Sequence, residues 1–150
     1  MEPYDLAIIG GGPAGLATAS HAQANGMKYI LLERTDHLAD TIYNYQARKF
    51  VMAEPAVIPA RSDLPFQPGS REAILDAWQR HVSDQKLNVQ LKAELKTLSK
   101  AGDRFVVGTA ADRSTGTAVL AYRVQGFSYS FATVWTQRVH FGTRRIRKEL

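Results

Sequence analysis

The stretch Asp5–Ala19, DLAIIGGGPAGLATA, decides how this chain of 150 residues can fold. A short apolar run turns abruptly into glycine and is followed by alanine-rich sequence. Glycine is costly to order, so a cluster of glycines needs a physical reason. The cluster here comprises Gly10, Gly11, Gly12 and Gly15. Their density predicts that another group comes close to the backbone at this point.

The elements around the glycines follow a strand, helix, strand order. The run Tyr4–Ile9 predicts a strand that is buried on both faces, as in a parallel sheet. Residues Pro13–Asn25 predict a helix, because proline suits a first helical turn and Gly26 is a natural C-terminal stop. A second strand is predicted at 29–33. The order and the total length of about thirty residues are those of a βαβ unit.

The glycines match the G-x-G-x-x-G fingerprint of dinucleotide-binding domains. Gly10 would permit the tight turn, Gly12 would leave room for a pyrophosphate, and Gly15 would let the helix pack closely on the strand. The N-terminus of the helix after Pro13 would point its N–H groups at the phosphates. Glu33 could accept hydrogen bonds from both adenosine ribose hydroxyls and would repel a 2′-phosphate, which disfavours NADP. The alternative is a tight turn with only a structural role.

The remaining sequence completes an α/β pattern. Ser70 resembles an N-cap, with Glu72 in the first turn, and predicts a helix over 70–85. Residues 34–69 lack a periodic pattern and predict a long connection. Two further parallel strands are expected at 87–91 and 118–121, with an inserted β hairpin near 104–118 and a turn at ADRSTG (111–116). The predicted fold is α/β, a three-layer Rossmann-like dinucleotide-binding domain with a parallel sheet and an inserted β hairpin, in incomplete form.

Composition excludes several classes of protein. Apolar residues make up 45% of the chain and charged residues 22%, as in ordinary globular domains. No apolar run has membrane-spanning length, and the N-terminus does not resemble a signal peptide. The absence of cysteine excludes disulfides, a thiol nucleophile and cysteine-ligated metals. These features predict a cytoplasmic protein with no membrane partner.

Charged and metal-binding side chains offer weaker candidates. The net charge of +5 arises in residues 101–150, and the basic cluster Arg144–Lys148 could attract nucleic acid or an anionic membrane. Because the cluster is short, a solvated terminus and no nucleic-acid partner are expected. Asp36 and Asp40 near Glu33 could suggest a cation site, but a solvated loop is favoured and no metal is predicted. The histidines lack metal-ligand spacing; they are His21, His37, His81 and His140.

The fingerprint stretch, with the following YILLER, resembles the N-terminal FAD-binding part of the pyridine nucleotide-disulfide oxidoreductases and thioredoxin reductase-like flavoproteins. The segments TIYNYQARKFVMAEP and LPFQPGSREAILDAWQRHV are similar to their cysteine-free, bacillithiol disulfide reductase-like branch. The resemblance runs from about Tyr4 to Ala121. It implies an NAD(P)H-dependent flavin oxidoreductase with FAD as cofactor, in which hydride passes from nicotinamide to flavin and on to an acceptor.

The resemblance also implies a set of FAD-binding residues and no catalytic residue. Glu33 would bind the adenosine ribose, Arg34 would lie beside the adenine, and the backbone of Leu95 would read the adenine. Tyr43 and Tyr45 fall where this branch runs past the flavin, and ordinary aromatic packing is the alternative. The pyrophosphate turn would comprise Gly10, Gly11, Gly12, Pro13, Ala14 and Gly15.

The sequence departs from the family pattern towards its C-terminus. The strand at 118–121 continues into Tyr122 and Arg123, where a small-residue turn near the flavin is expected. A second G-x-G-x-x-G is absent, so NAD(P)H would bind only if a further domain or a partner chain supplies the site. We expect a partial FAD-binding domain at 1–121 and an atypical basic tail at 122–150, from truncation or a frameshift. Reading the coding DNA in the other two frames tests the frameshift.

Two alternative functions follow from the same residues. The chain could be a non-catalytic dinucleotide-binding fragment or subunit whose site a partner completes. It could also be the N-terminal domain of a flavin monooxygenase-type protein, which shares the fingerprint.

Overall fold

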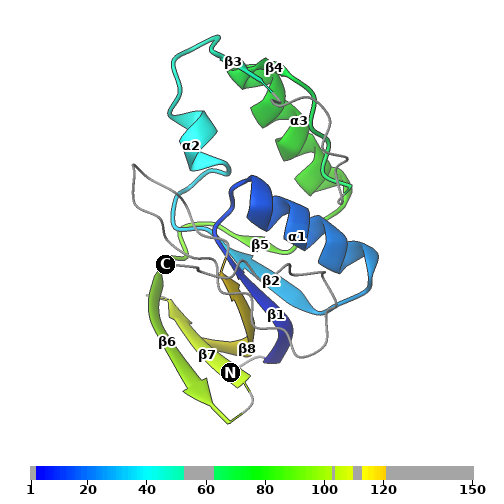
Figure 1. Cartoon of the computed structure of the whole chain (residues 1–150). Coiled ribbons are helices and arrows are strands. Elements are labelled where there is room, and N and C mark those ends of the chain that lie inside the picture. Colours follow the sequence, from blue (N-terminus) through cyan, green and yellow to red (C-terminus); the bar gives the residue numbers. More distant parts are fainter. Residues whose placement is uncertain (1–2, 53–62, 103, 110–112, 121–150) are drawn as a thin grey trace, which may run out of the picture.

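The computed structural model describes residues 3–52, 63–102, 104–109 and 113–120 (Figure 1). Within these residues a mixed sheet carries helices on one face. The elements, in chain order, are β1 (Pro3–Ile9), α1 (Pro13–Ala24), β2 (Tyr29–Leu32), α2 (Asp40–Tyr43), β3 (Phe50–Val51), β4 (Gly69–Ser70), α3 (Arg71–Asp84), β5 (Val89–Gln90), β6 (Leu95–Ala101), β7 (Arg104–Thr109) and β8 (Arg113–Leu120).

The main sheet has the strand order β5-β2-β1-β8-β7-β6. The strands β5, β2, β1 and β8 are parallel, as the sequence predicts. The strands β6, β7 and β8 form antiparallel pairs. The strand β8 belongs to both halves, because Gly116 pairs with β7 and the following residues Thr117–Leu120 pair with β1.

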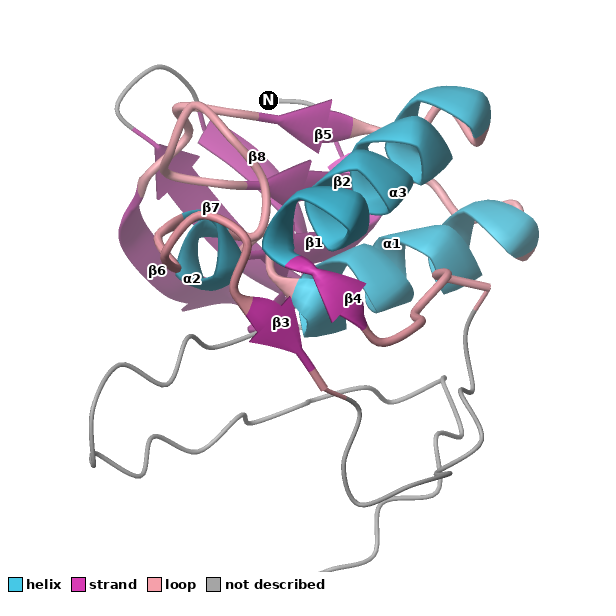
Figure 2. Cartoon of the chain, turned by 90° about the horizontal axis from the view of Figure 1, so that it is seen from above, coloured by secondary structure: helices cyan, strands magenta, loops and turns pink. Residues whose placement is uncertain are grey.

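The helices α1 and α3 lie side by side over the sheet (Figure 2), joined by a 2.9 Å hydrogen bond between Ser20 Oγ and His81 Nε2. The helix α1 ends as predicted, because Gly26 follows it with a φ of 64°. The helix α3 begins as predicted, because Ser70 Oγ accepts a hydrogen bond from the Ala73 N–H at 3.2 Å.

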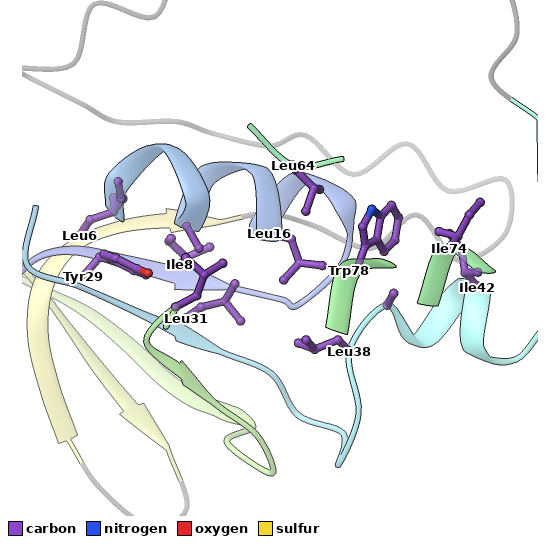
Figure 3. Packing of buried hydrophobic residues seen from close by; sticks show 14 residues of the cluster. Leu6, Ile8, Leu16, Tyr29, Leu31, Leu38, Ile42, Leu64, Ile74 and Trp78 are labelled. Carbon is purple, nitrogen blue, oxygen red and sulfur yellow. The ribbon is translucent and has the colours of Figure 1, made fainter. Parts of the chain in front are cut away.

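Alternate residues of the parallel strands face two separate core clusters. Leu6, Ile8 and Leu31 face the helices, where they pack with buried residues that include Leu16 and Trp78 (Figure 3). Ala7, Ile30 and Leu32 face the other way and pack with Ala93 and with Val107 of β7. The parallel strands β1 and β2 are therefore buried on both faces, by the helices on one side and by Ala93 and Val107 on the other.

Two details of the sequence prediction are wrong. The turn expected at 111–116 is not a turn over 113–116, because these residues pair with β7 as the first half of β8. The strand β6 was not expected, since six of its seven residues are exposed and its sequence, LKTLSKA, lacks strict apolar alternation. The tail prediction at 122–150 lies outside the described residues.

Candidate dinucleotide-binding site

The glycine-rich turn leaves β1 in a conformation that needs glycine. Gly10 has a φ of 102°, a value that side chains rarely tolerate. Its N–H donates to the Leu32 carbonyl at 2.8 Å, which ties the turn to the end of β2. The predicted role of Gly10 in the tight turn is therefore visible in the backbone.

The other two fingerprint glycines have opposite surroundings. A Cβ on Gly15 would lie 1.9 Å from the Gly10 carbonyl oxygen, because α1 packs directly on the turn. A Cβ on Gly12 would meet no described atom within 4 Å. Gly15 thus allows close packing, whereas Gly12 leaves open space beside the backbone, where the fingerprint expects a pyrophosphate.

The first turn of α1 offers backbone donors next to this space. Gly12 is the N-cap residue, and its side chain cannot cap the helix. The first intrahelical hydrogen bond runs from the Leu16 N–H to the Gly12 carbonyl at 2.9 Å. The N–H groups of Ala14 and Gly15 come before it and therefore have no acceptor within the helix. Pro13 occupies the first helical position and has no N–H to satisfy. This arrangement suits an anion such as a phosphate.

Glu33 is buried beside the turn, with 6% of its surface exposed. Its Oε2 accepts a hydrogen bond from the Gly11 N–H at 2.6 Å. Its Oε1 accepts hydrogen bonds from the Thr35 N–H at 2.9 Å and the Thr35 hydroxyl at 3.0 Å. A buried carboxylate needs such partners. The bonds hold the carboxylate next to the glycine-rich turn.

The fourth glycine, Gly11, joins the turn to the loop after β2. Its carbonyl accepts a hydrogen bond from the Ala39 N–H at 2.9 Å. A Cβ here would lie 2.8 Å from Leu38 Cδ2 and 3.2 Å from Glu33 Oε2. Gly11 therefore lets the loop close over the turn. The sequence analysis missed Thr35, Leu38 and Ala39, because the fingerprint does not include contacts made by this loop.

Arg34 lies on the exposed side of the same loop. Its Nη2 is 3.6 Å from Asp40 Oδ2, and its side chain is 56% exposed.

The imidazole of His37 lies between two carboxylates, with Nδ1 2.8 Å from Asp36 Oδ1 and Nε2 3.1 Å from Asp40 Oδ1. The hydrogen bond from His37 lowers the pKa of Asp36. Among the described residues no group of three or more acidic or histidine side chains is arranged to hold a metal.

The two tyrosines already have ring contacts within the chain. The Tyr43 ring stacks on His37 with centroids 3.7 Å apart, and the guanidinium carbon of Arg71 lies 5.2 Å from its centroid. Tyr45 packs against the helix-side core, and Lys49 Nζ lies 4.3 Å from its ring centroid. The packing role left open in the sequence analysis is therefore present, and contact with a flavin stays a prediction.

Leu95 begins β6 opposite Thr109. Its side chain is partly buried against the cluster that contains Ala93. The Ala93 N–H donates to the Glu33 carbonyl at 2.8 Å, so this turn lies beside the end of β2. Adenine recognition by the Leu95 backbone stays a prediction.

No helix in the described part of the chain is both long enough and apolar enough to cross a membrane.

The family model for pyridine nucleotide-disulphide oxidoreductases matches residues 7–121. The chain belongs to this family. The match covers the glycine-rich turn, α1, Glu33 and the loop after β2, and it confirms the resemblance inferred from the fingerprint.

Individual relatives are similar over the same region. A ferredoxin--NADP reductase from Streptococcus equi subsp. zooepidemicus is 29% identical over 123 residues, covering 78% of this chain and 33% of the relative. Another from Lactobacillus johnsonii is 43% identical over 56 residues, covering 37% of this chain and 18% of the relative.

Solved structures confirm the Rossmann-like fold of this family member. A bacillithiol disulfide reductase from Staphylococcus aureus has a TM-score of 0.70 and 25% identity, covering 81% of this chain and 38% of the other. A flavin monooxygenase variant from Stenotrophomonas maltophilia has a TM-score of 0.68 at 18% identity, which shows the fold alone. The chain thus spans less than two fifths of each of these relatives.

Proposed function

We propose that this chain binds FAD through its ADP half, as the N-terminal part of an NAD(P)H-dependent flavin oxidoreductase. The observation that carries the proposal is the open space at Gly12, directly before the unpaired first turn of α1. A pyrophosphate there would accept hydrogen bonds from the Ala14 and Gly15 N–H groups. The helix dipole would favour its negative charge.

Glu33 supports a dinucleotide whose adenosine has free ribose hydroxyls. Its carboxylate is held beside the turn by the Gly11 and Thr35 N–H groups. A carboxylate accepts hydrogen bonds from ribose hydroxyls and repels a 2′-phosphate. The charge therefore disfavours NADP at this site, and the resemblance of the fingerprint stretch to the FAD-binding part of the family supports FAD over NAD.

The remaining predicted positions complete the proposal. Gly10 and Pro13 would shape the pyrophosphate turn, Arg34 would lie beside the adenine, and the Leu95 backbone would read it. Tyr43 and Tyr45 would lie on the flavin side, where their contacts with His37 and Lys49 hold the loop.

Bound FAD would supply a flavin that accepts hydride and passes electrons to an acceptor. The described residues would bind and orient its ADP half, and we assign none of them to catalysis. NAD(P)H would need a site from a further domain or a partner chain. A cytoplasmic location, a domain boundary at 121 and an origin of the tail by truncation or frameshift stay predictions.

The test compares FAD with FMN, which lacks the adenosine and one phosphate. The purified chain is titrated with each flavin, and bound flavin is followed by its visible absorption and fluorescence. We expect saturable binding of FAD, competition by ADP, and at least about tenfold weaker binding of FMN, because the site recognises the ADP half. Equal binding of FAD and FMN, or binding of neither, would exclude the proposed site.

The main alternative is a non-catalytic dinucleotide-binding subunit whose site a partner completes. Adding NADH to the FAD-loaded chain separates the two. Bleaching of the flavin absorption would support a complete oxidoreductase. Stable absorption would favour a subunit that depends on a partner for the nicotinamide site.

A further inference from the structure

Thr35 contacts the Glu33 carboxylate through two donors. Its N–H lies 2.9 Å and its hydroxyl oxygen 3.0 Å from Glu33 Oε1. The same hydroxyl oxygen lies 2.7 Å from the His37 carbonyl oxygen. A threonine hydroxyl carries one proton, so it donates to only one of these acceptors at a time. The proton can therefore turn between the carboxylate and the loop.

The position of this proton changes the acceptor capacity of Glu33. A carboxylate has about four acceptor positions on its two oxygens. The N–H groups of Gly11 and Thr35 occupy one position on each oxygen. When the Thr35 hydroxyl also donates to Oε1, one position remains, on Oε2. When the hydroxyl turns to the His37 carbonyl, a position opens on Oε1 as well, so that each oxygen can accept one more hydrogen bond.

A ribose diol presents two adjacent hydroxyl donors, which matches the second arrangement. The backbone of Thr35 is fixed, because its carbonyl accepts a hydrogen bond from the Lys92 N–H at 2.8 Å. Only the hydroxyl proton then has to move. The bond to the His37 carbonyl also holds the loop that aims the Thr35 N–H at the carboxylate.

We propose that Thr35 is a positioning residue that sets the preference of the site for a ribose with both hydroxyls. Its N–H orients the Glu33 carboxylate, and its hydroxyl satisfies Oε1 in the free protein and the His37 carbonyl in the complex. The inference rests on the proposed nucleotide site. It assigns to this site a specificity residue that lies outside the glycine fingerprint.

The experiment measures binding of ADP and 2′,3′-dideoxy-ADP to the full chain by calorimetry. Thr35→Val removes the hydroxyl at nearly constant shape, Thr35→Ser retains it, and Thr97→Val alters an exposed threonine of β6 as a matched control. We expect Thr35→Val to tighten ADP binding by about threefold to tenfold, since the free protein loses a charge-assisted hydrogen bond to Glu33 whereas the complex loses only the weaker one to the His37 carbonyl. Binding of dideoxy-ADP should change less than about twofold.

Thr35→Ser and Thr97→Val should both keep the wild-type affinities for ADP and dideoxy-ADP. An equal change in the binding of both nucleotides by Thr35→Val would indicate a merely structural role and overturn the proposal, as would weaker binding of ADP or no change in either. A wild-type chain that binds both nucleotides equally would also overturn it. A wild-type chain that binds neither would exclude the nucleotide site itself, and the role of Thr35 with it.

Discussion

The α-carbon of Gly15 faces the carbonyl oxygen of Gly10 so closely that a Cβ on Gly15 would lie 1.9 Å from that oxygen. The obstacle is backbone, and Gly10 is itself fixed by its hydrogen bond to the Leu32 carbonyl. A flexible side chain could move aside, but this carbonyl can move only if α1 shifts away from β1. The close packing of α1 on β1 therefore requires a residue without a Cβ at position 15.

Gly15→Ala should lower the free energy of unfolding by about 2–4 kcal/mol, because overpacking against backbone forces the helix outward. Urea unfolding followed by circular dichroism measures the loss. Gly26→Ala provides a second glycine substitution, at a position where no described atom lies within 4 Å of the added Cβ, although its φ of 64° adds strain. A Gly15→Ala protein as stable as the wild type would contradict the close contact.

Gly12→Ala should have the opposite profile. Its Cβ would enter open space, and its φ of −78° suits any residue, so stability should change by about 1 kcal/mol or less. Nucleotide affinity should fall about tenfold or more, because the methyl group would occupy the space proposed for the pyrophosphate. Titration with ADP, beside a urea unfolding curve, checks both parts. If the Gly12→Ala protein binds ADP as tightly as the wild type, the pyrophosphate does not lie beside Gly12.

The sequence predicts the fold correctly where a chemical requirement is local. The turn at Gly10, the proline at the start of α1 and the Ser70 cap each follow from residue type and spacing. Prediction from the sequence fails where pairing between strands that are distant in the chain decides the structure. The strand β6 has little apolar patterning, and residues 113–116 resemble a turn until β7 pairs with them.

The site shows the same division. The glycines and Glu33 form a known pattern, and the structure brings them together through the 2.6 Å bond between the Gly11 N–H and Glu33 Oε2. The contacts of Thr35 could not be foreseen, because they depend on how the loop after β2 folds back. Nothing in the spacing of a single threonine indicates which acceptor its hydroxyl will meet.

The Arg71 side chain should restrain the backbone of the segment that contains Tyr43 and Tyr45. Its Nε donates to the Tyr43 carbonyl at 2.9 Å, and Nη2 donates to the same oxygen. Arg71→Ala should therefore speed amide hydrogen exchange of Asn44 and Tyr45 by about fivefold or more. Exchange in α1 should stay unchanged, since the fold itself persists.

Arg80→Ala is the matched control for this prediction, because Arg80 pairs with Asp76 on the outer surface of the same helix. It should leave exchange at Asn44 and Tyr45 unaltered. Equal acceleration by both arginine variants, or acceleration throughout the chain by Arg71→Ala, would show that helix destabilisation is the cause. The hydrogen bonds from Arg71 to the Tyr43 carbonyl would then have no separate effect on this segment.

Glu72 should make stability depend on pH in the acidic range. The Arg48 N–H, which lies 3.1 and 3.2 Å from its two carboxylate oxygens, holds the pKa of Glu72 below its ordinary value of 4.5, with further help from the Glu72 N–H and from Arg71. A lowered carboxylate pKa adds stability above the unfolded-state pKa, and this stability is lost as pH falls through the folded-state pKa. Glu72→Gln should therefore have a lower urea midpoint than the wild type at neutral pH.

That difference should shrink as the pH falls below 4.5, because protonation removes the advantage of the wild-type carboxylate. Urea unfolding curves of both proteins between about pH 7 and pH 3 measure the trend. Asp84→Asn serves as control, because Asp84 is the last residue of α3, where the helix dipole disfavours a negative charge. It should not reproduce the loss at neutral pH. A difference between Glu72→Gln and wild type that stays constant with pH would place the effect in packing and not in the charge.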